Sequence, residues 1–273
     1  MISVVQLGTI DYATGLKLQQ QLVALRKEEK IGDVLLLLEH KPVITLGRNA
    51  KAANVVASPE FLKQRGVELF ECDRGGDVTF HGPGQIVGYP IFDLRGYERS
   101  ADASTTPASS RKTLGVIEFV RRLEDVLIRT CADFGIATKR VPGLTGVWTD
   151  FREGHDFSRA GNYAENSAAL AAGGHDAEAK IAAIGVHISR SVTSHGFALN
   201  VNTDLSYFNL IIPCGITSKP VTSMQKELGR KLDPSSVTES ISRNFGKVFQ
   251  SQILWVDGVD SLLCRADALA RVP

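Results

Sequence analysis

Residues Arg74 to Gln85 bring several side chains that can do chemistry into one short, glycine-rich stretch. It reads Arg-Gly-Gly-Asp-Val-Thr-Phe-His-Gly-Pro-Gly-Gln, so a guanidinium, a hydroxyl, an imidazole and an amide lie among glycines and a proline. Glycine lets a backbone approach a ligand closely and adopt positive φ angles. The stretch matches neither the G-x-x-x-x-G-K-S/T nor the G-x-G-x-x-G pattern of phosphate loops. We therefore predict a binding loop of another kind, leading into a strand over 86–94.

Cys214 differs from an ordinary buried thiol in its surroundings. Pro213 and Gly215 flank it after an apolar stretch, which predicts a turn that can expose and aim the sulfur. Most unpaired cysteines are small buried hydrophobes, and Cys131, on the apolar face of a predicted helix, fits that description. A nucleophilic cysteine also requires a cation or a helix N-terminus that favours its thiolate.

Lys180 is the cation that the sequence context favours as this neighbour. It begins the run Lys-Ile-Ala-Ala-Ile-Gly-Val, whose small residues leave room for a ligand, although a lysine at a strand end is most often a solvated flank. His81 and His195 are retained as candidate site residues. The other four histidines are assigned to strand ends or insertions, without a catalytic role: His40, His155, His175 and His187.

These residues need a scaffold, and the apolar pattern predicts one in which strands and helices are interspersed. Strands are expected at 2–7, 34–38, 43–46, 67–70, 86–94, 137–141, 147–149, 181–188 and 196–201. Helices are expected from an Asp11 cap to about Lys30, after a Ser58 cap, over 114–134 up to Gly135, and from an Asp233 cap to Phe249. Because the order is not strictly βαβ, we predict an α/β or α+β domain with a mixed β-sheet and packed helices.

Two of the predicted helices have apolar positions that should face the core. In the helix over 114–134 these are Leu114, Ile117, Val120, Leu123, Val126, Leu127, Cys131 and Phe134, spaced by three or four residues. In the first helix they are Leu16, Leu22, Val23 and Leu25.

Composition narrows the class of protein. The chain has 273 residues, 43% hydrophobic and 22% charged, and a net charge of +1, which does not fit a dedicated nucleic-acid binder. No apolar run approaches the length of a transmembrane helix, and the first residues predict a strand rather than a signal peptide. Its 4 cysteines form no C-x-x-C pair, so we expect neither disulfides nor a zinc site, and a reducing cytoplasm as location.

Two segments lack the pattern of the rest. Residues 100–110 are rich in Ser, Thr and Ala, and 150–179 are rich in Gly, Ala, Asn and Glu. We expect both to be mobile surface insertions in a single catalytic domain over 1–250, followed by a C-terminal extension over 251–273.

The ordered motifs together resemble the lipoyl(octanoyl) transferase family over about residues 1–250, apart from the two insertions. The resemblance rests on the 74–85 motif, Gly146-Val147-Trp148, the run 180–185, His195-Gly196-Phe197-Ala198-Leu199-Asn200, and Pro213-Cys214-Gly215. It implies a catalytic domain of the biotin/lipoate ligase type. The segment between Trp148 and Lys180 is longer than is usual in this family, so the resemblance predicts nothing about partner contacts there.

The resemblance also implies roles for individual residues. Cys214 matches the nucleophile that forms an acyl thioester, and Lys180 matches the lysine that lowers the pKa of the thiol and transfers protons. Three stretches match segments that line the acyl substrate: Arg74, Gly75, Gly76, Asp77, Val78, Thr79, Phe80 and His81; Ala183, Ile184 and Gly185; and Gly196, Phe197 and Ala198. Backbone N–H groups near Gly185 or Gly215 are candidates for binding the oxyanion.

The implied reaction takes an octanoyl group from octanoyl-acyl carrier protein to a lysine of a lipoyl domain. The implied acceptors are the E2 subunits of 2-oxoacid dehydrogenases and the glycine cleavage H protein. No cofactor, metal, nucleic acid or membrane is expected.

Three other functions fit parts of the sequence. An ATP-dependent lipoate or biotin ligase on the same fold needs a lysine but no cysteine nucleophile. An octanoyl amidotransferase between two proteins differs only in its donor. A non-catalytic acyl-binding module needs neither Lys180 nor Cys214, so retention of both residues favours an enzyme.

Overall fold

The structure, a computed structural model, describes residues 1–97, 113–149, 178–215 and 219–263. Within these residues the strands form two sheets. The larger sheet has the order β11 (Ile253–Trp255), β1 (Ile2–Ile10), β2 (Asp33–His40), β6 (Gln85–Ile91), β10 (Val192–Asn200), β9 (Lys180–Ser189), β8 (Leu144–Thr149) and β7 (Thr138–Val141). The first three strands are parallel and the others pair antiparallel, which confirms the predicted mixed sheet.

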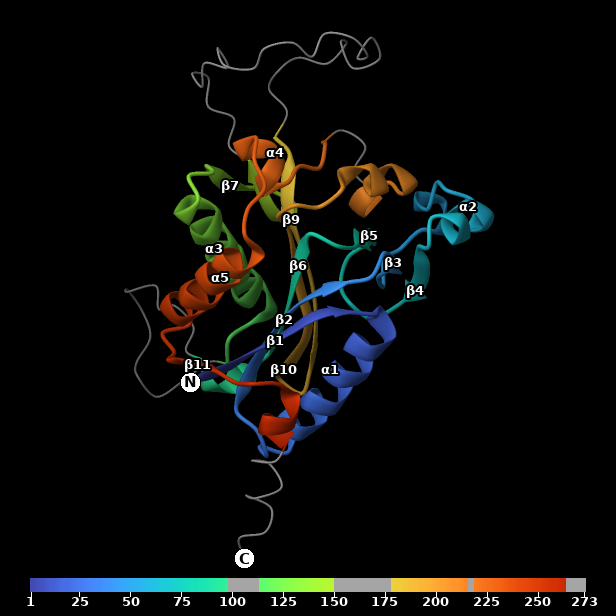
Figure 1. Ribbon diagram of the computed structural model, residues 1–273. Helices are drawn as coiled ribbons and strands as arrows, with labels where there is room; N and C mark the ends of the chain where they lie inside the picture. Colours follow the sequence, from blue (N-terminus) through green and yellow to red (C-terminus); the bar gives the residue numbers. More distant parts are fainter. Residues whose placement is uncertain (98–112, 150–177, 216–218, 264–273) are drawn as a thin grey trace, which may run out of the picture.

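Strand β2 shows how the sequence builds a layer on each face of this sheet. Its side chains point alternately to opposite faces. Leu35 and Leu37 enter the core under α3 (Val116–Asp133) and α5 (Pro234–Val248), whereas Leu36 and Leu38 enter the core that includes Leu22 of α1 (Tyr12–Lys27). Figure 1 shows α3 and α5 on one side of the sheet and α1 on the other. The leucine run is therefore a strand covered on both faces, as its continuous apolar character predicts.

A smaller sheet stands beside the larger one and carries the glycine-rich stretch. Its order is β4 (Glu68–Glu71), β3 (Val43–Leu46) and β5 (Val78–His81). Short helices adjoin the two sheets: α2 (Pro59–Gln64), α4 (Met224–Leu228) and the 3-10 turns Ala52–Asn54, Leu94–Gly96, Leu205–Leu210 and Pro213–Gly215. The loop between β4 and β5 thus lies where the two sheets meet, because Gly75 donates its N–H to the carbonyl of Val186 in β9 at 3.0 Å.

The predicted helix caps are confirmed. The side chains of Asp11, Ser58 and Asp233 each accept a hydrogen bond from a backbone N–H in the first turn of their helix. Such caps satisfy N–H groups that have no partner within the helix. Gly135, just after α3, has φ 81°, as expected for a glycine that ends a helix.

The structure corrects several details of the sequence-based prediction. The interval 74–85 is not one loop, since Val78 to His81 form β5. The strand over 86–94 ends at Ile91, and Leu94 opens a 3-10 turn. Ile117 is 75% exposed, because α3 turns Phe119 inward instead. In α1 the buried face consists of Tyr12, Gly15, Gln19 and Leu22, so of the predicted apolar positions Leu22 alone is fully buried.

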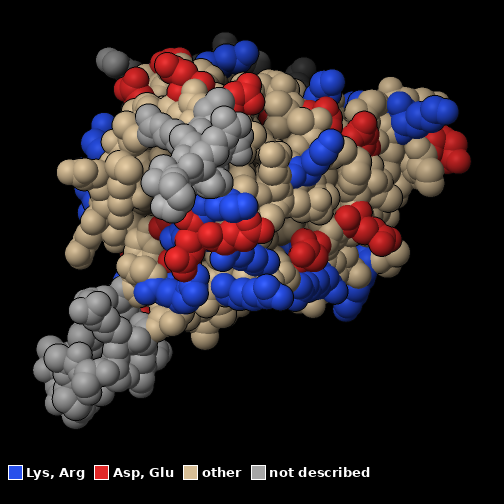
Figure 2. All heavy atoms as spheres, turned by 90° about the horizontal axis from the view of Figure 1, so that it is seen from below, with Lys and Arg blue, Asp and Glu red and all other residues tan. Residues whose placement is uncertain are grey.

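Residues after 250 contribute to the domain. Strand β11 extends the larger sheet by pairing with β1, and Leu262 is 5% exposed within the core on the α1 face. The insertion over 100–110 lies outside the described residues, as does the one over 150–179 up to residue 177. No described helix is long and apolar enough to span a membrane. Figure 2 shows acidic and basic side chains interspersed on the face seen from below.

Candidate active site

The loop Arg74–Asp77 is held on both sides by backbone hydrogen bonds. The N–H groups of Gly47, Arg48 and Asn49, just after β3, donate to carbonyls of the loop, and Gly75 donates to β9. A Cβ atom at Gly185 of β9 would lie 2.7 Å from the Gly75 carbonyl oxygen, so glycine is required where the strand and the loop meet. The loop is therefore a fixed wall rather than a free segment.

The Arg74 side chain explains how this wall is anchored. Its guanidinium donates to the hydroxyl and carbonyl oxygens of Thr45 in β3 and to the Gly75 carbonyl, at 2.7 to 3.1 Å. Arg74 is 8% exposed. Because most of its hydrogen-bonding capacity is used within the protein, we interpret Arg74 mainly as the residue that holds the loop.

The three predicted substrate stretches surround one hollow. Its wall includes 12 of the 14 predicted residues, namely Arg74, Gly75, Gly76, Asp77, Thr79, His81, Ala183, Ile184, Gly185, Gly196, Phe197 and Ala198. The other two, Val78 and Phe80, pack in the core of the smaller sheet. Alternation along β5 explains the division, since Thr79 and His81 face the hollow and their neighbours face away.

The His81 side chain lines this hollow as a neutral imidazole. Burial lowers its pKa to about 3. Its Nδ1 lies 2.7 Å from Gln85 Oε1, while Gln85 Nε2 donates to Phe80 O and Asn200 Oδ1. Gln85 therefore presents its oxygen to the imidazole, which makes His81 Nδ1 the donor and leaves Nε2 as an acceptor. The imidazole ring of His81 also stacks on the Tyr12 ring, with 6.4 Å between the two ring centres.

Sequence reasoning retained His195 but missed the residues that hold it. His195 Nε2 donates to Asp73 Oδ1 at 2.7 Å, and its backbone N–H donates to Gln19 Oε1 at 2.7 Å. Its φ of 55° is unusual within a strand. Burial lowers the pKa of His195, and the hydrogen bond to Asp73 opposes that shift. Spacing along the first helix could have indicated Gln19, whereas Asp73 had no signal except adjacency to Arg74.

Lys180, at the start of β9, lines a second and smaller cavity. The side chain is 8% exposed, and its Nζ lies 4.7 Å from the centre of the Trp148 ring. Its backbone is fixed by Pro220 O, which accepts from the Lys180 N–H, and by the Thr222 N–H, which donates to Lys180 O. Pro213 lines the same cavity. Lys180 and the cysteine motif, far apart in sequence, thus meet at one place.

The two cavities are neighbours. Thr79, Ala183 and Ala198 line both of them. These residues come from β5, β9 and β10, so the junction lies where the smaller sheet meets the larger one. A ligand in the larger hollow would therefore have one end close to the cavity of Lys180 and Pro213.

The backbone of Cys214 lies in the 3-10 turn Pro213–Gly215, which is tied to the glycine loop. Ile212 donates its N–H to the carbonyl of Asn54, and Asn54 Nδ2 donates to Asp77 Oδ2 at 2.6 Å. The N–H of Gly215, a candidate oxyanion donor, donates to Ile212 O at 3.1 Å within the turn. Asn54 therefore connects the cysteine turn to the loop that lines the hollow.

The other described cysteines have different surroundings. Cys131 is buried in α3, and burial raises its pKa to about 12, which confirms the prediction of a structural thiol. Cys72 is half-buried, and its Sγ lies 3.4 Å from Leu46 O. Cys264 lies outside the described residues.

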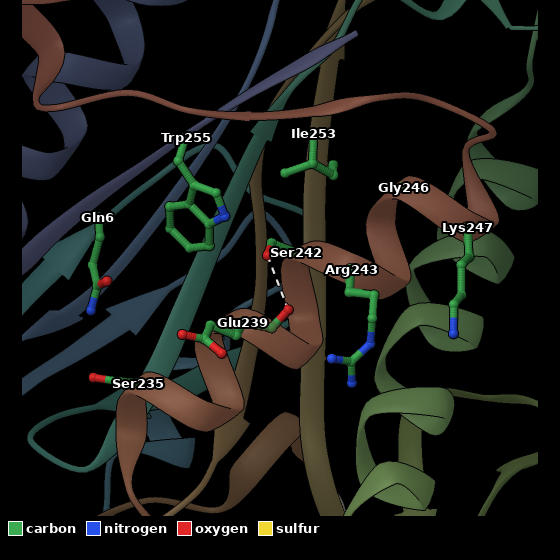
Figure 3. A pocket seen from close by; sticks show the side chains of 9 residues that line it. All are labelled: Gln6, Ser235, Glu239, Ser242, Arg243, Gly246, Lys247, Ile253 and Trp255. Carbon is green, nitrogen blue, oxygen red and sulfur yellow. Dashed lines mark hydrogen bonds between the residues drawn. The ribbon is translucent and has the colours of Figure 1, made fainter.

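A larger open groove lies elsewhere, between α5 and the β1–β11 edge (Figure 3). Its lining includes Gln6, Arg243, Lys247 and the 45% exposed Trp255, and none of the predicted site residues. Size alone therefore does not identify the site. Among the described residues, no group of three or more His, Cys, Asp or Glu side chains is arranged to hold a metal ion.

Solved structures support the fold. A bi-partite lipoate protein ligase from Thermoplasma acidophilum has a TM-score of 0.63 at 14% identity, over 98% of this chain and 92% of that chain. Lipoate-protein ligase A bound with ATP has a TM-score of 0.61 at 14% identity, over 98% and 94%. At such low identity these likenesses concern the fold alone, and they confirm the predicted lipoate ligase-like domain.

Sequence comparison is more specific. An "Octanoyltransferase" of Koribacter versatilis is 57% identical over 100% of this chain and 94% of its own length. An "Octanoyltransferase" of Acidobacterium capsulatum is 51% identical over 96% of both chains. The family described as "Lipoyl protein ligase A/B catalytic domain" matches residues 11–246. The chain therefore belongs to the lipoyl protein ligase A/B catalytic-domain family.

Proposed function

We propose that this protein is an acyltransferase that moves an octanoyl group from an acyl carrier protein, through a thioester on Cys214, to a lysine of a lipoyl domain. The observation that carries this proposal is the junction of the two cavities. Lys180 and Pro213 line one of them, and the three predicted substrate stretches line the other. The high identity to curated octanoyltransferases supports octanoyl transfer within lipoylation.

The proposed chemistry uses the thiol of Cys214 together with the buried amine of Lys180. A lysine ammonium favours the thiolate of Cys214, which attacks the carbonyl carbon of the donor thioester. Lys180 then protonates the departing thiol of the donor. In the second half-reaction Lys180, now neutral, accepts a proton from the attacking lysine of the lipoyl domain. Thioester exchange is nearly balanced and amide formation is downhill, so no nucleotide is needed.

The hollow that the three predicted stretches line suits the uncharged acyl chain. Its wall contains Val87, Tyr89 and Phe197, and the His81 imidazole is neutral around pH 7 because burial lowers its pKa to about 3. An apolar wall with a few directed polar groups is typical of a small-molecule site. We therefore assign the acyl chain to this hollow and the reacting carbonyl to its junction with the Lys180 cavity.

An ATP-dependent ligase is the second candidate, because ligases share the fold. Two observations favour the transferase. The cysteine motif lies at the same cavity as Lys180, although a ligase needs no nucleophilic thiol. The guanidinium of Arg74 is already hydrogen bonded to Thr45 and Gly75, so it is not available to bind a triphosphate.

The partners follow from the reaction. Octanoyl-acyl carrier protein is the proposed donor, and lipoyl domains of 2-oxoacid dehydrogenase E2 subunits and the glycine cleavage H protein are the proposed acceptors. A reducing cytoplasm is the proposed location, because the reaction requires a free thiol at Cys214.

The direct test is a covalent octanoyl adduct. Incubation with octanoyl-acyl carrier protein should add the mass of one octanoyl group, which hydroxylamine removes. The adduct should be absent from Cys214→Ala and present in the matched control Cys72→Ala. An adduct that maps to Cys72, Cys131 or Cys264 would overturn the assignment.

A second experiment separates the transferase from the ligase. The apo lipoyl domain is mixed with the enzyme and octanoyl-acyl carrier protein without nucleotide, or with free octanoate, ATP and magnesium. The transferase should modify the lipoyl domain in the first mixture, as seen by its mass. Modification in the second mixture alone would make the protein a ligase.

A further inference from the structure

Asn200 lies in the cavity where the reaction is proposed to occur. It is the last residue of β10, is 4% exposed, and lines this cavity together with Lys180 and Pro213. Asn200 ends the His195-Gly196-Phe197-Ala198-Leu199-Asn200 motif, and no role is predicted for it from the sequence. A buried amide at this position requires hydrogen-bond partners, because an unsatisfied buried polar group is costly.

The orientation of the Asn200 amide is fixed by its two neighbours. Its Nδ2 lies 2.9 Å from the carbonyl oxygen of Thr222, and its Oδ1 lies 2.8 Å from Gln85 Nε2. A carbonyl can only accept, so the nitrogen of Asn200 must be the atom that faces Thr222. Thr222 in turn donates its backbone N–H to the carbonyl of Lys180. Asn200 and Lys180 are therefore held by the same backbone unit.

The Asn200 amide nitrogen has one hydrogen more than the described residues use. The nitrogen carries two hydrogens, and the carbonyl of Thr222 accepts one of them. In the part of the chain that the structure describes, no acceptor is found for the other. A directed donor that has no acceptor among the described residues, in a cavity that Lys180 and Pro213 also line, is suited to stabilise negative charge on a substrate oxygen.

We propose that the second N–H of Asn200 Nδ2 donates to the oxyanion of the tetrahedral intermediates, an inference that rests on the proposed function. When the Cys214 thiolate attacks, a new C–S bond forms and the carbonyl π electrons move to oxygen, where Asn200 donates. Collapse reforms the carbonyl, breaks the donor C–S bond, and releases the donor thiol with a proton from Lys180. The same oxygen becomes negative again when the amine of the lipoyl domain attacks the acyl-enzyme.

The backbone donors considered from sequence are less suitable. The N–H of Gly215 already donates to Ile212 O. Val186 accepts from Gly75 on the open side of β9, so by strand alternation the N–H of Gly185 points to the other side, toward β10. Thr79 lines the same cavity, so its hydroxyl is the rival donor that an experiment must separate from Asn200.

The experiment compares acylation with alkylation of the same thiol in Asn200→Ala, Thr79→Val and the control Asn202→Ala. Asn202 is a matched amide, because it exchanges two hydrogen bonds with the Leu232 backbone and is not among the residues that line the cavity. Acylation of Cys214 by octanoyl-acyl carrier protein and transfer to the lipoyl domain are each timed by mass. Alkylation by iodoacetamide forms no oxyanion and reports thiol reactivity alone.

In Asn200→Ala, acylation and transfer should each slow by about 10²- to 10³-fold, the usual loss when one oxyanion donor is removed. Alkylation should stay near the wild-type rate, and Asn202→Ala should match wild type in all three assays. Equal losses in alkylation and acylation would make Asn200 merely structural and overturn the proposal. So would unchanged acylation, or a loss confined to Thr79→Val. A wild-type protein that forms no adduct on Cys214 would instead refute the proposed function.

Discussion

Acid should destabilise the folded protein between about pH 6.5 and pH 4, because two buried histidines stay neutral in the fold. Burial lowers the pKa of His81 to about 3 and that of His40 to about 4. In the unfolded chain both should titrate near their ordinary value of about 6.5. The unfolded state therefore binds more protons in this range, so the stability is fully present above about pH 6.5 and is lost as the pH falls.

The size of the effect follows from proton counting. Each histidine that gains its proton only on unfolding contributes about 1.4 kcal/mol per pH unit, so two give about 2.7 kcal/mol per unit near pH 5. Burial also lowers the pKa of His195, which adds in the same direction. Hydrogen bonds, led by that from Ser240, lower the pKa of Asp133 to about 2, so this carboxylate affects stability only at lower pH. Domains are usually stable by about 5–15 kcal/mol, so the loss should be large.

Urea unfolding across this pH range measures the slope. Trp148 is 1% exposed, so its fluorescence should report loss of the core. His81→Asn and His40→Asn should each reduce the slope by about 1.4 kcal/mol per pH unit, and the double variant by twice that. These differences are independent of any loss of stability at neutral pH. A wild-type slope below about 1.4 kcal/mol per unit near pH 5, or single variants that keep the wild-type slope, would refute the reasoning.

Three further outcomes are expected. Arg74→Lys should lower the free energy of unfolding by roughly 2–4 kcal/mol in urea titrations, because an ammonium cannot reproduce the forked contacts; an unchanged midpoint would contradict this. Lys180→Ala should slow octanoyl transfer by about 10²- to 10⁴-fold, and Lys180→Arg should not restore it; an unchanged pH profile of Cys214 alkylation would exclude the role. Replacing 152–176 by a short Gly/Ser linker should leave Tm and transfer nearly unchanged, because described residues on either side are hydrogen bonded to each other. A lower affinity for the lipoyl domain alone would make that segment a docking element.

Local signals predicted much of the fold. The periodic apolar positions of α3 and the caps at Asp11, Ser58 and Asp233 depend on residues close in sequence, and these elements are where expected. The exposed Ile117 shows the limit of spacing alone, since a residue at the edge of an apolar stripe faces the core only if a neighbouring element covers it.

Two strands that depend on distant partners, β5 and β11, were not predicted. The sequence Val78 to His81 alternates as a strand should, yet the surrounding glycines indicated a loop, and pairing with β3 decides the outcome. Strand β11 has 3 residues and is defined by pairing with β1, near the other end of the chain.

The site also has features that local motifs predicted and features that depend on contacts between distant residues. Motifs indicated residues of which most line one hollow, but they could not tell which side chains support its wall and which face the cavity. That difference depends on contacts between strands, such as Arg74 with Thr45 or Asn200 with Gln85. Tyr12 and Gln19 were missed because a helix stripe of tyrosine, glycine and glutamine does not look apolar, although their helical spacing with the buried Leu22 was a signal.

The pairing of β11 with β1 has a consequence for synthesis of the protein. Ile2 pairs with Ile253, so this contact cannot form until nearly the whole described chain has left the ribosome. At about 5–20 residues per second, the wait is on the order of tens of seconds. Until then the outer edge of β1 has free N–H and C=O groups, which other strands can bind. The nascent chain is therefore exposed to aggregation along the outer edge of β1 until β11 has been synthesised and pairs with it.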